Sequence, residues 1–126
     1  MSRTDARIRY TQGVLKQALL SFLQEKPINK ITVKEVCERA ELNRATFYAH
    51  YSDCFALLES IEEDLLEAFQ QSLKLVQDEL RLTEPLVAKG AAGQVEVIRL
   101  RRQVSDLRGK IDEARNDYLV RAHEEQ

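Results

Sequence analysis

The side chains best suited to chemistry in this sequence gather between residues 43 and 50. Arg44, Thr46 and Tyr48 can donate hydrogen bonds, and His50 can donate or accept one. In a helix, one face of this segment would carry Arg44, Ala45, Tyr48 and Ala49, with Thr46 and His50 at its margins. That face has no large aliphatic side chain. It therefore suits the major groove of DNA, where base edges present distinguishable donors and acceptors.

The cysteines predict neither catalysis nor metal binding. Cys37 and Cys54 form no CxxC motif and no Cys/His cluster, which argues against a structural zinc site and a disulfide framework. Cys54 is near His50 in sequence, but Ser52 and Asp53 break the helix between them and no third group orients the pair. We expect reduced thiols, no catalytic residue, no metal and no cofactor.

The charge is unevenly distributed along the 126 residues, although the net charge is only −2. Residues 1–51 carry +4, residues 52–82 carry −6, and residues 83–126 are neutral. A basic first segment favours contact with a polyanion, although a solvated helical surface gives the same local imbalance. No apolar run is long enough to span a bilayer and no secretory signal is evident, so we expect a soluble, cytoplasmic protein without a membrane partner.

The first fifty residues predict three helices. The first runs from Ile8 to Gln24 and ends before Pro27. Its apolar stripe consists of Leu15, Ala18, Leu19, Phe22 and Leu23. Thr32 starts a second helix through a capping box with Glu35, and residues 41–43 make a tight turn. Asn43 caps a third helix, from Arg44 to Tyr51, in which Phe47 and Tyr51 face inward. This pattern predicts a helix-turn-helix domain over residues 1–52.

A long fourth helix is expected over residues 53–82, with N-cap chemistry from Ser52 and Asp53. Its apolar stripe consists of Leu58, Ile61, Leu65, Phe69, Leu73, Val76 and Leu80. This apolar stripe is longer than a small three-helix unit can cover, so the rest of it must pack against another apolar surface. We expect a second copy to supply it, with dimerisation through Leu65, Phe69, Leu73 and Val76.

The remaining residues, 83–126, predict a short helical tail. Thr83-Glu84-Pro85 is typical of a helix stop and restart, and the segment from Gly90 to Gly93 is a further weak point. A heptad follows: Val97, Val104, Ile111 and Tyr118 at one position, and Leu100, Leu107, Ala114 and Arg121 at the other. It favours a parallel two-stranded coiled coil between copies, through Leu100, Val104, Leu107 and Ile111, with an antiparallel bundle as the alternative. The expected fold class is all-α.

The run from Ile31 to Leu58, ITVKEVCERAELNRATFYAHYSDCFALL, resembles the DNA-binding domain of the TetR family of bacterial repressors. The likeness extends from about Arg7 to Leu58. Its specific marks are Ile31-Thr32-Val33, Arg44-Ala45-Thr46-Phe47-Tyr48 and His50-Tyr51-Ser52-Asp53. The resemblance implies a homodimeric regulator that binds a palindromic operator in double-stranded DNA.

The same resemblance implies roles for individual side chains. Arg44, Ala45 and Ala49 would lie closest to the bases. Arg44 would either donate two hydrogen bonds to guanine or bind a phosphate. The full expected DNA-binding set is Thr32, Lys34, Asn43, Arg44, Ala45, Thr46, Tyr48, Ala49 and His50. Four of these residues would contact the phosphate backbone: Thr32, Thr46, Tyr48 and His50. Lys30, Lys34 and the leader Arg3, Arg7 and Arg9 would add charge, and the leader could reach a minor groove.

Each role has an alternative: Tyr48 as a packing residue, His50 as a surface residue, and the leader as a solvated tail. The sequence also departs from the family. Glu41 replaces a common glycine in the turn, and Cys54 stands where a phosphate-contacting lysine is common. After residue 82 the chain is too short for the family's usual ligand-binding domain, so an inducer is doubtful. The tail is either native or composite, and a protein-interaction module that keeps the fold without using DNA is the rival function.

Overall fold

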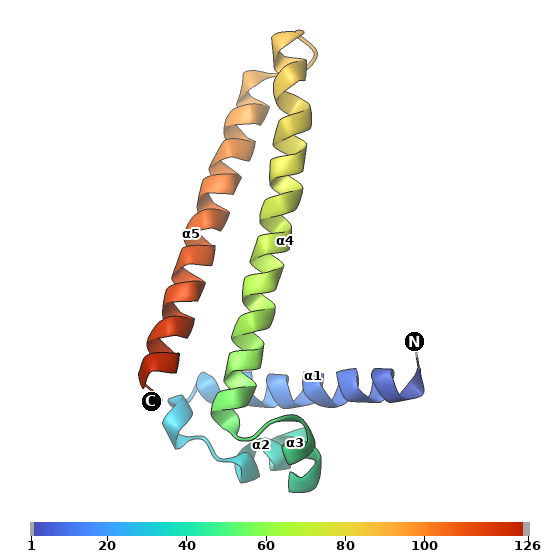
Figure 1. The fold of residues 1–126 in the computed structure, drawn as a ribbon, viewed down its shortest axis with the longest axis vertical. Coiled ribbons are helices and arrows are strands. Elements are labelled where there is room, and N and C mark those ends of the chain that lie inside the picture. Colours follow the sequence, from blue (N-terminus) through green and yellow to red (C-terminus); the bar gives the residue numbers. More distant parts are fainter. Residues whose placement is uncertain (1, 125–126) are drawn as a thin grey trace. The chain divides into compact units, whose positions relative to one another are not determined.

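The computed structural model describes residues 2–124, with side chains as far as residue 117, and every regular element in this part of the chain is helical. The elements are α1 (Arg3–Leu23), the short 3₁₀ turn η1 (Ile28–Lys30), α2 (Val33–Ala40), α3 (Arg44–His50), α4 (Cys54–Ala88) and α5 (Gln94–Glu124), as Figure 1 shows. The all-α prediction is confirmed. The chain divides into two compact units, Met1–Ile61 and Glu62–Gln126.

The first unit begins with a longer helix than the sequence predicted. Ser2 caps α1, and its hydroxyl accepts a hydrogen bond from the Asp5 backbone N–H at 3.1 Å. The Asp5 carboxylate also suits the positive end of the helix dipole. The predicted start at Ile8 is therefore wrong. Because Arg3, Arg7 and Arg9 are exposed helical residues, the leader is not an extended tail of the kind that reaches into a minor groove.

The core of the first unit joins α1, α2, α3 and the first turns of α4. It consists of Leu15, Ala18, Leu19, Phe22, Ile31, Val36, Cys37, Phe47, Tyr51, Cys54, Leu57 and Leu58. Phe47 is fully buried and Tyr51 is 8% exposed, so the prediction that both face inward is confirmed. Since the core includes Leu57 and Leu58, the boundary between the two compact units lies inside α4.

The turn between α2 and α3 depends on Glu41. The Leu42 N–H donates to the Cys37 carbonyl and the Glu41 N–H to the Glu38 carbonyl, which is the Schellman arrangement at a helix end. Glu41 adopts the left-handed conformation that this arrangement requires, with φ 58° and ψ 42°. A glycine would adopt it without strain. The turn thus keeps the geometry that glycine usually provides.

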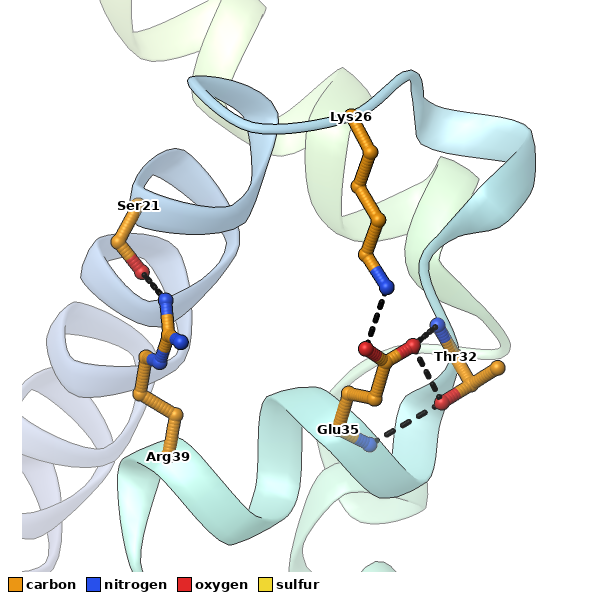
Figure 2. A network of polar contacts seen from close by, with 5 residues as sticks. All are labelled: Ser21, Lys26, Thr32, Glu35 and Arg39. Carbon is orange, nitrogen blue, oxygen red and sulfur yellow. Dashed lines mark hydrogen bonds and ion pairs between the residues drawn. The ribbon is translucent and has the colours of Figure 1, made fainter.

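A polar network fixes α2 against the end of α1 (Figure 2). Glu35 accepts from Lys26, from the Thr32 N–H at 3.2 Å and from the Thr32 hydroxyl at 3.1 Å. The Thr32 hydroxyl in turn accepts from the Glu35 N–H at 3.1 Å, which confirms the predicted capping box. A single carboxylate therefore holds both helix ends.

A second contact in Figure 2 links α2 to the last turn of α1. The Arg39 guanidinium donates to the Ser21 hydroxyl at 2.8 Å, and it lies 3.7 Å from the centre of the Phe22 ring. This cation–π contact covers the edge of the apolar core. The two contacts together set the angle at which α2 meets α1.

The second unit consists of α4 from Glu62 onward and α5, which run antiparallel as a hairpin (Figure 1). At the start of α4, Asp53 accepts from the Ala56 N–H at 2.8 Å, so the predicted cap is confirmed.

The predicted end of α4 near Thr83 is wrong, because α4 continues through Pro85 to Ala88. Proline removes one backbone hydrogen bond, yet the helix continues on both sides of it, with Thr83 before the proline and Val87 after it both half-buried. The helix ends where Gly90, at φ 74°, allows a second Schellman arrangement.

The two helices of the hairpin meet through matching heptads. The half-buried inner row of α4 consists of Leu66, Phe69, Leu73, Val76, Leu80, Thr83 and Val87. The facing residues of α5 are the buried Val97, Leu100, Val104 and Ile111 and the half-buried Leu107 and Ala114. The Glu84–Arg101 hydrogen bond, at 3.4 Å, and Lys110 above the Phe69 ring flank this interface.

This pairing corrects two predictions. The α5 heptad packs on α4 of its own chain, so it is not free to form the predicted parallel coiled coil with a second copy. Within the chain, α4 and α5 of the hairpin run antiparallel. Leu65 does not belong with Phe69, Leu73 and Val76: it is 48% exposed, and its neighbour Leu66 occupies the inner row. The predicted heptad residues Tyr118 and Arg121 lie outside the described side chains.

Candidate nucleic-acid interface

The exposed face of α3 is the candidate interface. Arg44, Ala45, Tyr48 and Ala49 are all exposed, at positions that share one side of the helix. The opposite side is buried through Phe47, and the Asn43 side chain caps the helix by accepting from the Thr46 N–H at 2.7 Å. Burial on one side and a cap at the start fix which residues face solvent. The helix is only seven residues long, so its outer face is short, and it carries two alanines, an arginine and a tyrosine.

Tyr48 combines exposure with a fixed ring. It is 55% exposed, and its ring lies edge-on to Phe47, with ring centres 5.4 Å apart and planes at 79°. Edge-to-face contacts of this kind stabilise a defined ring orientation. Tyr48 therefore partly packs and remains accessible, so the two interpretations made from the sequence are compatible.

Arg44 is an accessible cation. It is exposed, and among the described residues no hydrogen bond or ion pair holds its guanidinium. Its charge acts on Cys37: burial raises the pKa of that thiol, and Arg44 opposes the rise. A free guanidinium at the first turn of α3 can donate to base edges or to phosphate oxygens.

The hydroxyl protons of Thr32 and Thr46 are already donated in hydrogen bonds within the protein. The Thr32 hydroxyl donates to Glu35, and the Thr46 hydroxyl donates to the Asn43 side-chain oxygen at 2.9 Å. A hydroxyl has one proton to donate, and phosphate oxygens only accept. Phosphate contacts from these two residues would require their present hydrogen bonds to change. Asn43 differs, since the cap uses only its oxygen and leaves the amide protons for another acceptor.

The other predicted residues lie around this face. Ala45 and Ala49 are exposed on α3, and Lys34 is exposed in the first turn of α2. His50 is half-buried, with its ring centre 6.2 Å from that of Tyr51. The α3 residues thus form one continuous surface, whereas Thr32 and Lys34 belong to the neighbouring helix.

The cysteines lack the properties of a nucleophile. Both are 4% exposed. Burial, reinforced by the negative charge of Asp53, raises the pKa of the Cys54 thiol to about 11. A thiol held protonated at neutral pH is neither a good nucleophile nor a good metal ligand.

A groove of about 620 Å³ runs between α4 and α5. Leu80 and Val104 line it together with Arg81, Arg101 and Arg108, and it is widely open to solvent. Drug-sized ligands usually occupy pockets that enclose most of their surface. We assign no ligand to this groove.

Two features were missed at the level of the sequence. The first is Arg39, whose position above Phe22 anchors α2; its polar type gave no sign of this contact. The second is an exposed row on α4 that includes Leu75 and Leu82, which are 70% and 68% exposed. Their seven-residue spacing, continued at Ala68, is a signal that was present in the sequence.

Comparison with known proteins supports a helix-turn-helix regulator. Over 62 residues, 49% of its length, the chain is 37% identical to YxbF of Bacillus subtilis (strain 168), named as an uncharacterised HTH-type transcriptional regulator. The chain covers 16% of that protein. No protein-family model and no solved structure matches the chain. Across residues 2–124, the structure contains no helix with the length and apolar character needed to cross a membrane.

Proposed function

We propose that this chain is a transcriptional regulator that binds duplex DNA in a sequence-specific manner through the outer face of α3. The observation that supports this most strongly is the exposure of Arg44, Ala45, Tyr48 and Ala49 on a short helix whose other side is buried. A face of small and hydrogen-bonding side chains can enter the major groove without a steric clash. Similarity to an HTH-type transcriptional regulator supports the same function.

The role of each residue in the interface depends on which hydrogen-bond donors are not already used within the protein. Arg44 and the Asn43 amide protons donate to DNA, the alanines contact thymine methyl groups, and Tyr48 contacts the backbone. Lys34, Lys30 and the exposed arginines of α1 add a positive field that strengthens binding to any sequence. His50, Thr32 and Thr46 complete the proposed set, the two threonines after rearrangement of their present hydrogen bonds.

We further propose that the regulator is a homodimeric repressor of the TetR type. Its resemblance to that family over residues 7–58 supports this, and a symmetric dimer implies a palindromic operator. The protein would act in the cytoplasm, where the operator is accessible.

Selection of preferred sequences from a random duplex pool tests this function. We expect an enriched motif with two inverted half-sites. Fluorescence anisotropy with the selected duplex should show binding that weakens steeply as the salt concentration rises, since released counterions drive much of the affinity. No enrichment, together with salt-insensitive or undetectable binding, would favour the protein-interaction module instead.

A further inference from the structure

The long helix α4 carries a second heptad that its own chain leaves uncovered. The outer α4 row consists of Leu65, Ala68, Ser72, Leu75, Glu79, Leu82 and Leu86. Every member is exposed, and each precedes a residue of the inner row by one position. The two rows are therefore about 100° apart around the helix. Because α5 covers only the inner row, the outer row needs a different partner.

The exposure of this row is large for a soluble protein. Leu75 and Leu82 are 70% and 68% exposed, and Leu65 and Leu86 are 48% and 43% exposed. The row extends over 21 residue steps, or about 32 Å at 1.5 Å per residue. Isolated exposed leucines are common, but a regular row of this length marks an interaction surface.

We infer that the outer α4 row pairs with the same row of a second copy, in an antiparallel arrangement with its twofold axis near Leu75. This inference builds on the homodimer in the proposed function and assigns a surface to it. The pattern is self-complementary: Leu65 lies across from the partner's Leu86, Ala68 from the partner's Leu82, and Ser72 from the partner's Glu79. Small residues meet large ones, and the Ser72 hydroxyl donates to the single carboxylate in the row.

The charges determine the direction of pairing. In a parallel pair identical residues face each other, so Glu79 would meet the partner's Glu79 at close range, which is unfavourable. The antiparallel register avoids this repulsion. Arg99 lies near enough to Glu79 for the carboxylate to contribute to the raised pKa of Arg99, behind the larger effect of Glu96. Lys110, above the Phe69 ring, adds a second positive charge beside α4.

Charge also argues against a lipid surface as the occupant. Residues 52–82 carry a net charge of −6, which an anionic membrane would repel. A second copy can pair through the leucines of the row, because the one carboxylate within the row, Glu79, lies across from the partner's Ser72 and the other acidic side chains lie outside the row.

The test compares two substitutions on α4 in the full chain. Leu75→Glu places a charge near the twofold axis, whereas Lys74→Glu changes an exposed residue outside the outer row. By light scattering after size exclusion, we expect wild type and Lys74→Glu to be dimers. Leu75→Glu should dimerise at least about tenfold more weakly, with helix content and melting temperature preserved. A Leu75→Glu variant that remains fully dimeric would overturn the inference.

Crosslinking tests the register. Chains with Leu65→Cys and chains with Leu86→Cys, mixed and treated with a short bis-maleimide, should give mainly the mixed dimer. Each variant alone should crosslink poorly, and the buried native cysteines give little background. Strong crosslinking of Leu65→Cys with itself would instead indicate parallel pairing and refute the register.

The oligomeric state also separates this inference from the proposed function. A monomeric wild-type chain that still binds a half-site would refute the dimer surface and the proposed homodimer, but not DNA binding through α3, and would leave the outer row for a further segment of a longer protein. A dimer with the expected crosslinks that binds no duplex would refute the DNA-binding function alone.

Discussion

Arg44 is the residue from which the DNA interface can be tested most directly. It is exposed, and its guanidinium is uncommitted within the described residues, so its removal should not disturb the fold. Tyr48 is less independent, since its ring contacts Phe47. A substitution of Arg44 should therefore change DNA binding without changing stability, whereas a substitution of Tyr48 should change both.

Replacement of Arg44 by alanine should weaken binding to the selected duplex while the melting temperature stays nearly constant. If Arg44 contacts phosphate, affinity falls for every sequence and the salt slope decreases by about one. If it contacts guanine, the loss is about 1–3 kcal/mol and is confined to the cognate base. Anisotropy titrations at several salt concentrations distinguish these cases. Arg102→Ala, which removes an exposed arginine of α5, is the control and should change little.

Cys54 should make the protein sensitive to alkaline pH. Its pKa of about 11 in the fold exceeds the ordinary 9.0, so the folded state holds the thiol proton more tightly than the unfolded state does. This contribution to stability is fully present below pH 9 and is lost as the pH rises from 9 toward 11. Urea unfolding at pH 7, 9 and 10.5 should show a smaller loss for Cys54→Ala than for wild type. Parallel losses in the two proteins would contradict the assignment.

At the scale of elements, caps explain both the successes and the errors of prediction. Thr32, Asn43 and Asp53 are recognisable caps, and the helices that follow them start where the sequence placed them. Ser2 is also a cap, but the apolar stripe of α1 begins well after it, so periodicity alone placed the start too late. Pro85 indicated an end to α4 that the packing of Val87 overrides.

The capping box of α2 gives a prediction at this scale. Thr32→Ala removes the hydroxyl that accepts from the Glu35 N–H, and it should lower the free energy of unfolding by about 1 kcal/mol. Thr32→Ser keeps the hydroxyl and should lose much less. Urea denaturation followed by circular dichroism measures both. A serine variant as unstable as the alanine variant would show that the methyl group, rather than the cap, matters.

The heptads show which part of the fold could not be predicted. Val97, Leu100, Val104 and Ile111 were correctly identified as one apolar face, but periodicity does not reveal which helix covers it. The structure shows a short connection at residues 89–93, which makes α4 and α5 antiparallel neighbours in the same chain. For α3, the sequence identified the outward residues because an inward pair, Phe47 and Tyr51, fixed the helix orientation.

At the scale of the whole molecule, the two units carry the two proposed binding surfaces separately. The first unit presents α3, and the second presents the outer α4 row, with α4 entering both. The core of each unit is separate, so a substitution in one should leave the other folded. The hairpin can therefore be weakened without direct damage to the proposed DNA-binding face.

Leu100 provides the corresponding prediction. It is fully buried in the hairpin, and Leu100→Ala should destabilise the hairpin by about 2–5 kcal/mol. Ile98→Ala, at a position 55% exposed on the same helix, should change stability by less than about 0.5 kcal/mol. Hydrogen exchange should show faster exchange in α5 of the Leu100 variant while α1 and α2 stay protected. Equal loss of protection in both units would mean that they unfold together.

The turn that follows Gly90 has a consequence for how the protein acquires its structure. Since only a few residues separate the end of α4 from the start of α5, the chain closes a short loop before the heptads meet. Helix pairs with such local contacts fold within microseconds to milliseconds. A newly made chain would thus bury Leu100 and Leu107 against its own α4 before it encounters another molecule, and this kinetic order protects those residues from intermolecular aggregation.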